Sequence, residues 1–190
     1  YAYGSAGYLL TPLIESRVVL AEGDTDVSQR TIFLKGANVS LEVKAVSIEK
    51  PGGVFSTGSI TLSGTDAQFS SLFCGSLPPS GTVNVGFDII PVPVLRKIAA
   101  SSGAATGDRW SAEVLATVTI LGVLGNDDVE SLPFQFPVAV CNNCVVQNLG
   151  ACPKTAVNTG NACNMFQDGV VDCCVDAEGF LVCPAIAAVN

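Results

Sequence analysis

The stretch Val39-Ser-Leu-Glu-Val-Lys-Ala-Val-Ser-Ile-Glu49 decides the fold class, because apolar and polar side chains alternate along it. Successive side chains of an extended strand point to opposite faces of a sheet, so this pattern predicts a strand with one buried and one wet face. The alternation slips near Val46, which predicts a β-bulge. Further strands are expected over 17–21, 32–34, 58–62, 68–73, 82–90, 112–124 and 129–140.

Turn sequences separate these strands. They are rich in Gly, Pro, Asn and Asp and occupy 23–24, 51–53, 64–66, 78–81 and 125–128. We expect the last of them to be a hairpin loop between two long strands. The segment 92–100 instead has apolar residues at helical spacing and predicts one or two helical turns. Many strands at regular spacing predict a mainly β fold, an antiparallel β-sandwich of immunoglobulin-like or jelly-roll-like type.

The cysteines are distributed unevenly along the chain. One of the eight, Cys74, lies in the first 140 residues, and the other seven follow from Cys141 onwards. We therefore expect an N-terminal arm or strap over 1–16, a β-sandwich over 17–140, and a disulfide-rich, loop-rich tail over 141–190 packed on the sandwich. The tail has few bulky apolar residues, so it needs cross-links to fold.

All eight cysteines are expected to form structural disulfides, which are typical of an oxidising, extracytoplasmic compartment. They are Cys74, Cys141, Cys144, Cys152, Cys163, Cys173, Cys174 and Cys183. If all are paired, Cys74 must bond to a tail cysteine. The neighbours Cys173 and Cys174 are expected to diverge to two partners, because a ring closed between them is strained. The connectivity otherwise stays open.

Two other interpretations of the cysteines fit the surrounding residues less well. A zinc site favours paired CxxC motifs and histidine, but this chain has one CxxC, Cys141–Cys144, and no histidine. A thioredoxin-like redox motif needs its CxxC between a strand and a helix, whereas Asn142-Asn143 is a turn pair. The lack of histidine also excludes Ser-His-Asp and Cys-His catalysis. We therefore expect a protein that is not an enzyme and needs no cofactor.

Charged residues are scarce and mostly acidic. Nine Lys and Arg oppose 17 Asp and Glu, and the net charge of −8 disfavours nucleic acid and anionic lipid as partners. The chain is 48% hydrophobic and 14% charged, which fits either a compact β domain that buries most of its own apolar surface or a subunit that contacts a protein partner or self-assembles. No apolar run approaches the ~18 residues of a transmembrane helix. Because the chain begins at Tyr1, a removed export signal or a lipid anchor in the precursor stays open.

Two groups of residues are candidates for binding sites. Oxygen ligands for calcium cluster in acidic loops at Asp24, Asp26, Asn126, Asp127 and Asp128, although solvated turns explain the same residues. All three tyrosines, Tyr1, Tyr3 and Tyr8, lie near the N-terminus. Because tyrosine is enriched at interfaces, they form a docking arm, or else a strap packed on the body or a frayed terminus.

The C-terminal region carries passages that resemble a known family. These are 129–141 with its Phe-Gln-Phe-Pro, the Cys-Asn-Asn-Cys-Val that follows, Ala162-Cys163, and Gln-Asp-Gly-Val-Val-Asp-Cys-Cys at 167–174. They resemble secreted cysteine-rich lipoproteins of myxobacterial type, which end a β domain with F-x-F-P, C-x-x-C and Q-D-x-x-V-D-C motifs. The resemblance implies a surface location and a lipid-anchored precursor, but no activity.

These observations together predict a non-enzymatic structural or interaction protein outside the cytoplasm. It would be secreted, periplasmic or at the outer membrane or cell surface, as an envelope component or a subunit of a larger surface assembly. The alternative is a ligand-binding module that holds calcium or carbohydrate on the sandwich loops.

Overall fold

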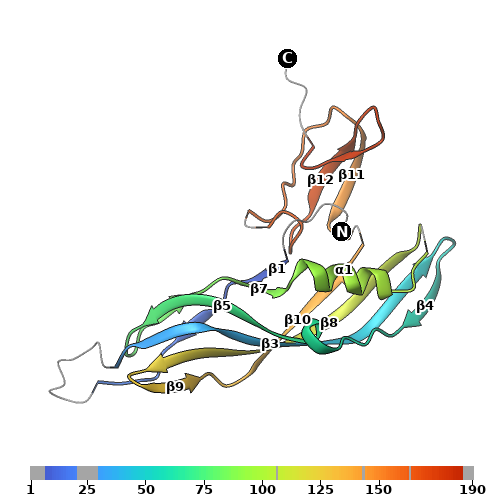
Figure 1. Ribbon diagram of the computed structural model, residues 1–190. Helices are drawn as coiled ribbons and strands as arrows, with labels where there is room; N and C mark the ends of the chain where they lie inside the picture. The colour runs from blue at the N-terminus through green and yellow to red at the C-terminus, as the bar shows by residue number, and fades with distance from the viewer. Residues whose placement is uncertain (1–6, 21–29, 106, 143, 163, 186–190) are drawn as a thin grey trace.

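The structure is a computed structural model that describes residues 7–20, 30–105, 107–142, 144–162 and 164–185. It is mainly β, as predicted, and its described residues form four sheets. The largest sheet has six antiparallel strands: β3 (Ile32–Lys50), β4 (Val54–Gly58), β5 (Gln68–Leu77), β8 (Arg109–Leu124), β9 (Asp127–Glu130) and β10 (Phe134–Cys141). Strand β3 lies at its centre (Figure 1).

The neighbours of β3 divide the large sheet into two sides. On one side β8 pairs with β3 along nearly its whole length, and β10 and β9 pair with β8. On the other side β5 pairs with the first half of β3 and β4 with the second half. The long strand β3 is therefore the partner that β4, β5 and β8 share.

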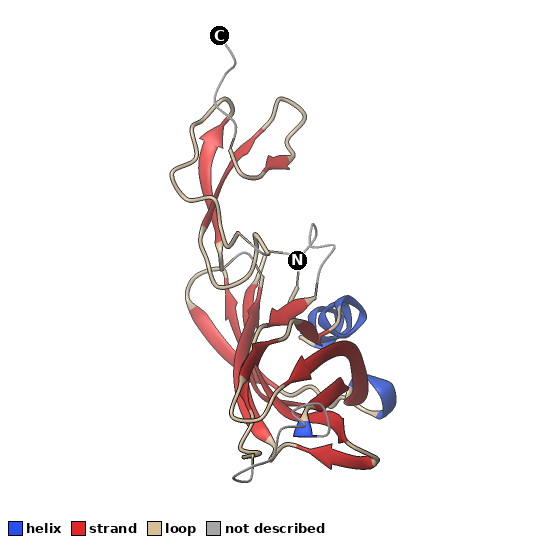
Figure 2. Cartoon of the chain, turned by 90° about the vertical axis from the view of Figure 1, so that its left-hand side faces the viewer, coloured by secondary structure: helices blue, strands red, loops and turns tan. Residues whose placement is uncertain are grey.

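A second, smaller layer covers one face of this sheet. It consists of β1 (Tyr8–Leu10) paired with β7 (Phe87–Ile90), β2 (Leu13–Glu15) paired with β6 (Thr82–Asn84), the helix α1 (Val92–Ser101), and the short 3-10 helix η2 (Gly64–Asp66). Both views place α1 against the sheet (Figures 1 and 2). One cluster of buried side chains joins the layers, including Ile89 of β7, Ile98 of α1, and Val114 and Val118 of β8.

The alternation in the sequence is visible in the burial of the strands. Along β8, buried and accessible residues alternate from Arg109 to Val123, as expected for a strand with one face on the core. In β3 the register shifts between Val43 and Ala45, which confirms the bulge predicted near Val46. A second shift occurs at Gly36, where an added Cβ would lie 2.4 Å from the Ser71 carbonyl oxygen.

Several predicted element boundaries are wrong. The stretches 32–34 and 39–49 belong to one strand, because the bulge at Gly36 lets the chain continue without a turn. Residues 17–20 and 59–62 are loops, and the strand expected at 58–62 lies instead at β4. The stretch 82–90 divides into β6 and β7, and 129–140 divides into β9 and β10. The helix predicted at 92–100 is confirmed as α1.

The tail forms a separate three-stranded sheet. Its strands are β11 (Val146–Ala151), β12 (Val171–Val175) and β13 (Leu181–Val182), and β12 pairs parallel with β11 and antiparallel with β13. Disulfides join Cys152 to Cys174 and Cys173 to Cys183, so the adjacent cysteines diverge as predicted. A third disulfide, Cys141–Cys144, closes the connection from the body. The tail projects away from the body as a lobe (Figure 2).

The position of Cys74 corrects the expectation that it bonds to the tail. Its thiol is free and exposed, and it forms no disulfide with any described residue. The cause is the alternation of β5, which places Cys74 with Leu72 and Ser76 on the outer face of the strand. Cys163 lies outside the described residues.

Candidate binding site

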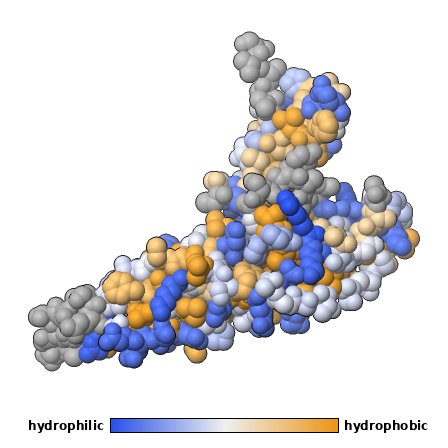
Figure 3. Space-filling view, in the orientation of Figure 1, coloured by the Kyte–Doolittle hydropathy of each residue, from blue (hydrophilic) through white to orange (hydrophobic). Residues whose placement is uncertain are grey.

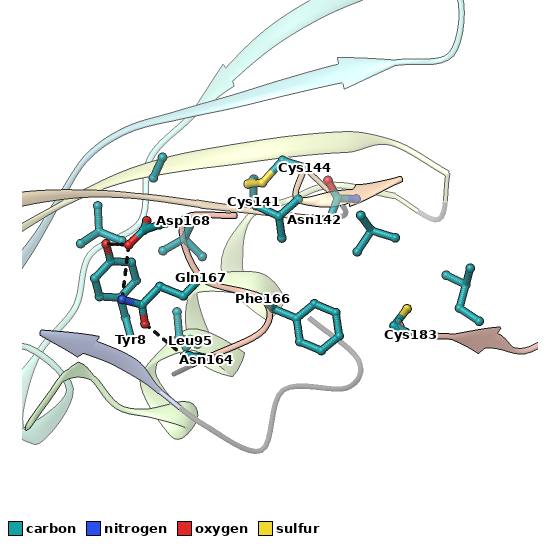
Figure 4. A pocket seen from close by; sticks show the side chains of 16 residues that line it. Tyr8, Leu95, Cys141, Asn142, Cys144, Asn164, Phe166, Gln167, Asp168 and Cys183 are labelled. Atoms are coloured by element: carbon teal, nitrogen blue, oxygen red, sulfur yellow. Dashed lines mark hydrogen bonds between the residues drawn. A yellow bond between two sulfur atoms is a disulfide. The ribbon is translucent and has the colours of Figure 1, made fainter. Parts of the chain in front are cut away.

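A cavity of about 410 Å³ lies where the tail meets the body, and we call it the junction cavity. Its walls come from segments that are far apart in the chain: β1, α1, the end of β10, the start of β11, the loop 164–168, and β13. Figure 4 shows Tyr8, Gln167 and Asp168 together at one end and Cys183 at the other, with Phe166 between them. The cavity therefore exists only because the tail is placed against the body.

A hydrogen-bonded group occupies one end of the junction cavity. The Tyr8 hydroxyl donates to Asp168 Oδ2 at 2.7 Å, and Gln167 Nε2 donates to the same oxygen at 3.3 Å (Figure 4). Burial, the hydrogen bond to Asp168 and the charge of that carboxylate all raise the pKa of Tyr8 above its usual range. The phenol therefore stays protonated at neutral pH and remains a donor.

Gln167 attaches the tail to the N-terminal strand. Its Oε1 accepts a hydrogen bond from Leu9 N at 2.9 Å, and its Nε2 donates to Leu9 O at 2.6 Å. The side-chain amide therefore satisfies both backbone groups of Leu9, as a neighbouring strand would. Asn164 adds a third bond, from Nδ2 to Gly7 O at 2.8 Å. At Gly7 an added Cβ would lie 2.6 Å from the Ile90 carbonyl oxygen, so the close pairing of β1 with β7 needs glycine.

The CxxC motif closes a turn at the end of a strand ladder. Asn142 Oδ1 accepts a hydrogen bond from Trp110 N at 2.7 Å, and Asn142 Nδ2 donates to Asp108 O at 2.8 Å. Asn142 thereby extends the pairing of β8 with β10 beyond Cys141. The next regular element after Cys144 is the strand β11, so the motif does not stand before a helix as a thioredoxin-like site requires.

The acidic loop candidates do not come together as a calcium site in the described part of the chain. The hairpin loop contains only Gly125 and Asn126, so Asp127 and Asp128 lie in β9 rather than in the loop. Both are exposed. Asp128 accepts a hydrogen bond from Lys35 Nζ at 2.6 Å. No group of three or more Cys, Asp or Glu among the described residues is arranged to hold a metal. Asp24 and Asp26 lie outside the described residues.

The tyrosines of the N-terminal arm have different outcomes. Tyr8 is half-buried and packs beside Phe136, with 6.1 Å between ring centroids. At this residue the arm is a strap on the body, the second of the two roles considered for it. Tyr1 and Tyr3 lie outside the described residues.

Asp172 organises the tail, a role that the sequence did not indicate. Its side chain is 2% exposed and accepts hydrogen bonds from Val157 N and Asn158 N, both at 2.8 Å, and from Asn158 Nδ2 at 3.1 Å. These bonds hold the pKa of Asp172 below its usual range. Both acidic residues of the Q-D-x-x-V-D-C passage have a structural role. Asp168 lines the junction cavity, and Asp172 orders the loop after β11.

Comparison of the chain with protein-family models, with curated proteins and with solved structures gives no match. Among the described residues, no helix has both the length and the apolar character needed to cross a membrane.

Proposed function

We propose that the protein is a non-enzymatic interaction protein of an extracytoplasmic compartment, where it is an envelope component or a subunit of a surface assembly. In this proposal it contacts a protein partner through one edge of the large sheet, which we call the β4–β5 edge. The observation that carries the proposal is the exposed apolar character of this edge.

The β4–β5 edge is open and apolar. Both strands pair with β3 on the same side, and neither pairs with a further strand among the described residues. Large apolar side chains project from them: Val54 is 60% exposed, Phe55 69% and Leu72 86%. Figure 3 shows apolar surface over the part of the body where β5 runs. An open edge presents unpaired N–H and C=O groups, and apolar side chains beside them favour docking of another chain.

The opposite edge of the sheet is built differently. Strand β10 carries Pro137 in its interior, and proline removes a backbone donor from the strand. Such a residue discourages a further strand from pairing. The contrast between the two edges supports the β4–β5 edge as the side that meets a partner.

The location outside the cytoplasm is supported by the chemistry of the tail. Two disulfides hold the tail lobe and a third closes its connection to the body, which is typical of proteins that fold in an oxidising compartment. The resemblance of the C-terminal motifs to secreted cysteine-rich lipoproteins is consistent with a surface location. The absence of histidine from the chain supports a function without histidine-dependent catalysis.

The test compares native mass and partner capture for three proteins. Leu72→Lys together with Phe55→Lys places two charges on the β4–β5 edge, and Leu132→Lys, at an equally exposed position between β9 and β10, is the matched control. We expect cross-linking in native envelope extracts to show an assembly for the wild type and the control but not for the edge variant. Light scattering of the purified wild type that gives a mass larger than one chain identifies the partner as a second copy. A wild-type protein that is monomeric and captures the same proteins as the edge variant contradicts the proposal.

A second candidate function is ligand binding, which the junction cavity favours. This binding site differs from the expected calcium or carbohydrate site because it lies at the junction with the tail rather than on the sandwich loops.

A further inference from the structure

We infer that the junction cavity binds a small amphiphilic cation, whose apolar body lies against Leu95, Phe166 and Leu181 and whose ammonium head lies at Asp168. This site is separate from the β4–β5 edge, so it stands or falls independently of the protein contact proposed above.

The size and lining of the cavity suit an apolar body. Its volume of about 410 Å³ lies within the ~300–1,000 Å³ of typical small-molecule sites. Side chains from four different segments give it apolar walls: Leu95 of α1, Val138 of β10, Phe166 of the tail loop and Leu181 of β13. Transfer of an apolar group from water onto such walls is favourable. An alkyl or aryl group of modest length therefore fits the interior.

The charge of the lining selects a cation. Of the described residues that line the cavity, only Asp168 is charged, and neither Lys nor Arg is among them. Asp168 Oδ2 already accepts from Tyr8 and Gln167, whereas Oδ1 accepts no hydrogen bond from the described residues. Asp168 lines the cavity and is exposed, so its second carboxylate oxygen is accessible to a ligand. An ammonium group can donate to it in a charge-assisted hydrogen bond, while an anion would be repelled.

The position of this carboxylate is held before any ligand arrives. Asp168 has a φ of 53°, in the left-handed region that Asp tolerates better than most residues. The bonds from Tyr8 and Gln167 restrain its side chain, and Gln167 is itself held by both backbone groups of Leu9. A site whose groups are already restrained loses less entropy when it binds.

An aromatic ring adds a second preference for a cation. The Tyr8 ring lies beside Asp168, where the ammonium head is placed, whereas Phe166 lies farther along the lining, with the apolar walls (Figure 4). The face of an aromatic ring attracts a positive charge, most strongly where water is excluded. The carboxylate and the Tyr8 ring therefore favour the same class of ligand.

The test uses three probes that have a similar eight-carbon alkyl group and differ in the charge of the polar head: octylammonium, 1-octanol and octanoate. Titration calorimetry on the full chain at neutral pH is expected to give the order octylammonium, octanol, octanoate, with about a tenfold advantage for octylammonium over octanoate. Asp168→Asn keeps an acceptor for Tyr8 and is expected to remove that advantage while leaving octanol unchanged. Glu178→Gln removes a charge from an exposed turn of the tail and serves as the control.

Two further variants test whether the octyl group of the probes lies in the junction cavity. Leu181→Trp fills the cavity and is expected to weaken all three probes strongly, and Phe166→Leu, which removes apolar contact with the octyl group, is expected to weaken all three probes alike, by about twofold to threefold. Octanoate binding as tight as octylammonium overturns the ligand class but leaves the cavity as a binding site. No binding of any probe at millimolar concentration, or binding that neither variant alters, overturns the site itself. Neither outcome affects the native mass that tests the β4–β5 edge.

Discussion

Replacement of Gln167 by Ala tests whether the tail holds the N-terminal strand in place. The wild-type amide makes hydrogen bonds of 2.9 and 2.6 Å to the N–H and C=O of Leu9. Alanine removes both, and the short strand β1 keeps its three-residue pairing with β7 and the hydrogen bond from the Tyr8 hydroxyl to Asp168. We expect local opening of β1 while the large sheet stays folded.

The size of the effect follows from these two bonds. Each typical intramolecular hydrogen bond contributes about 0.5–1.5 kcal/mol to stability, so the loss is about 1–3 kcal/mol. At about 1.4 kcal/mol per factor of ten, the opening equilibrium of β1 should rise roughly 5-fold to 150-fold. The cost falls on local opening rather than on global unfolding, because the hydrogen bonds of this amide join Leu9, Asn164 and Asp168, which lie outside the large sheet.

Amide hydrogen exchange measures this directly at Leu9. We expect faster exchange there in Gln167→Ala, with unchanged protection at Val114 in the core. Gln135→Ala is the matched control, because Gln135 is an exposed glutamine on the outer face of β10. Equal exchange at Leu9 in the wild type and in Gln167→Ala would refute the reasoning that the tail stabilises β1.

Three other perturbations test the tail and the core. Hydrogen bonds lower the pKa of Asp172 in the folded protein, so its contribution to stability is present above the unfolded pKa of about 3.9 and is lost as pH falls through the folded pKa. Asp172→Asn should therefore make the tail less stable at pH 7 and less sensitive to acid, as read from exchange of the two amides that bond to this carboxylate. Replacing Cys152 and Cys174 together by Ser opens a loop with a sequence separation of 22 and should destabilise the tail by about 3 kcal/mol in urea unfolding followed by a tail probe; an unchanged midpoint would argue against this cross-link. Ile98→Ala removes a fully buried side chain of α1 and should lower the free energy of unfolding of the body by about 2–5 kcal/mol, whereas a loss below that range would mean that the layer under α1 collapses to fill the space.

The parts of the fold that follow local patterns could be predicted. The alternation around Val39 identifies the central strand and its bulge, and the spacing of Leu95 and Ile98 identifies α1, because each pattern is contained within one element. The boundaries failed where a long-range contact decides them. The sequence predicted separate strands over 32–34 and 39–49, but in the sheet Gly36 allows a close approach to Ser71 and the strand continues.

The cysteine prediction shows a different limit. An even count suggested that Cys74 pairs with the tail, although the alternation of β5 already placed this residue on a face with Leu72 and Ser76. A count treats all cysteines as equivalent, whereas pairing requires Cβ atoms that face each other at short distance. The divergence of Cys173 and Cys174 was predictable because it depends on local geometry alone.

The junction cavity could not be predicted, because its walls are brought together only by the placement of the tail. The segment from Gln167 to Cys174 explains how this placement is achieved. Gln167 and Asp168 contact the N-terminal strand, while Asp172 binds the loop after β11 and both cysteines at its end are cross-linked. The disulfides therefore fix β12, and β12 fixes the loop that contacts β1.

This chain of contacts couples the redox state of the tail to the junction cavity. If the disulfides at Cys173 and Cys174 position the loop, their reduction should release Leu9 from Gln167 without unfolding the large sheet. Exchange at Leu9 should then rise on reduction to about the level of Gln167→Ala, and reduction of the variant should add little, because both changes remove the same contact. Additive effects of reduction and substitution would mean that the loop is held against β1 by something other than the cross-linked strand.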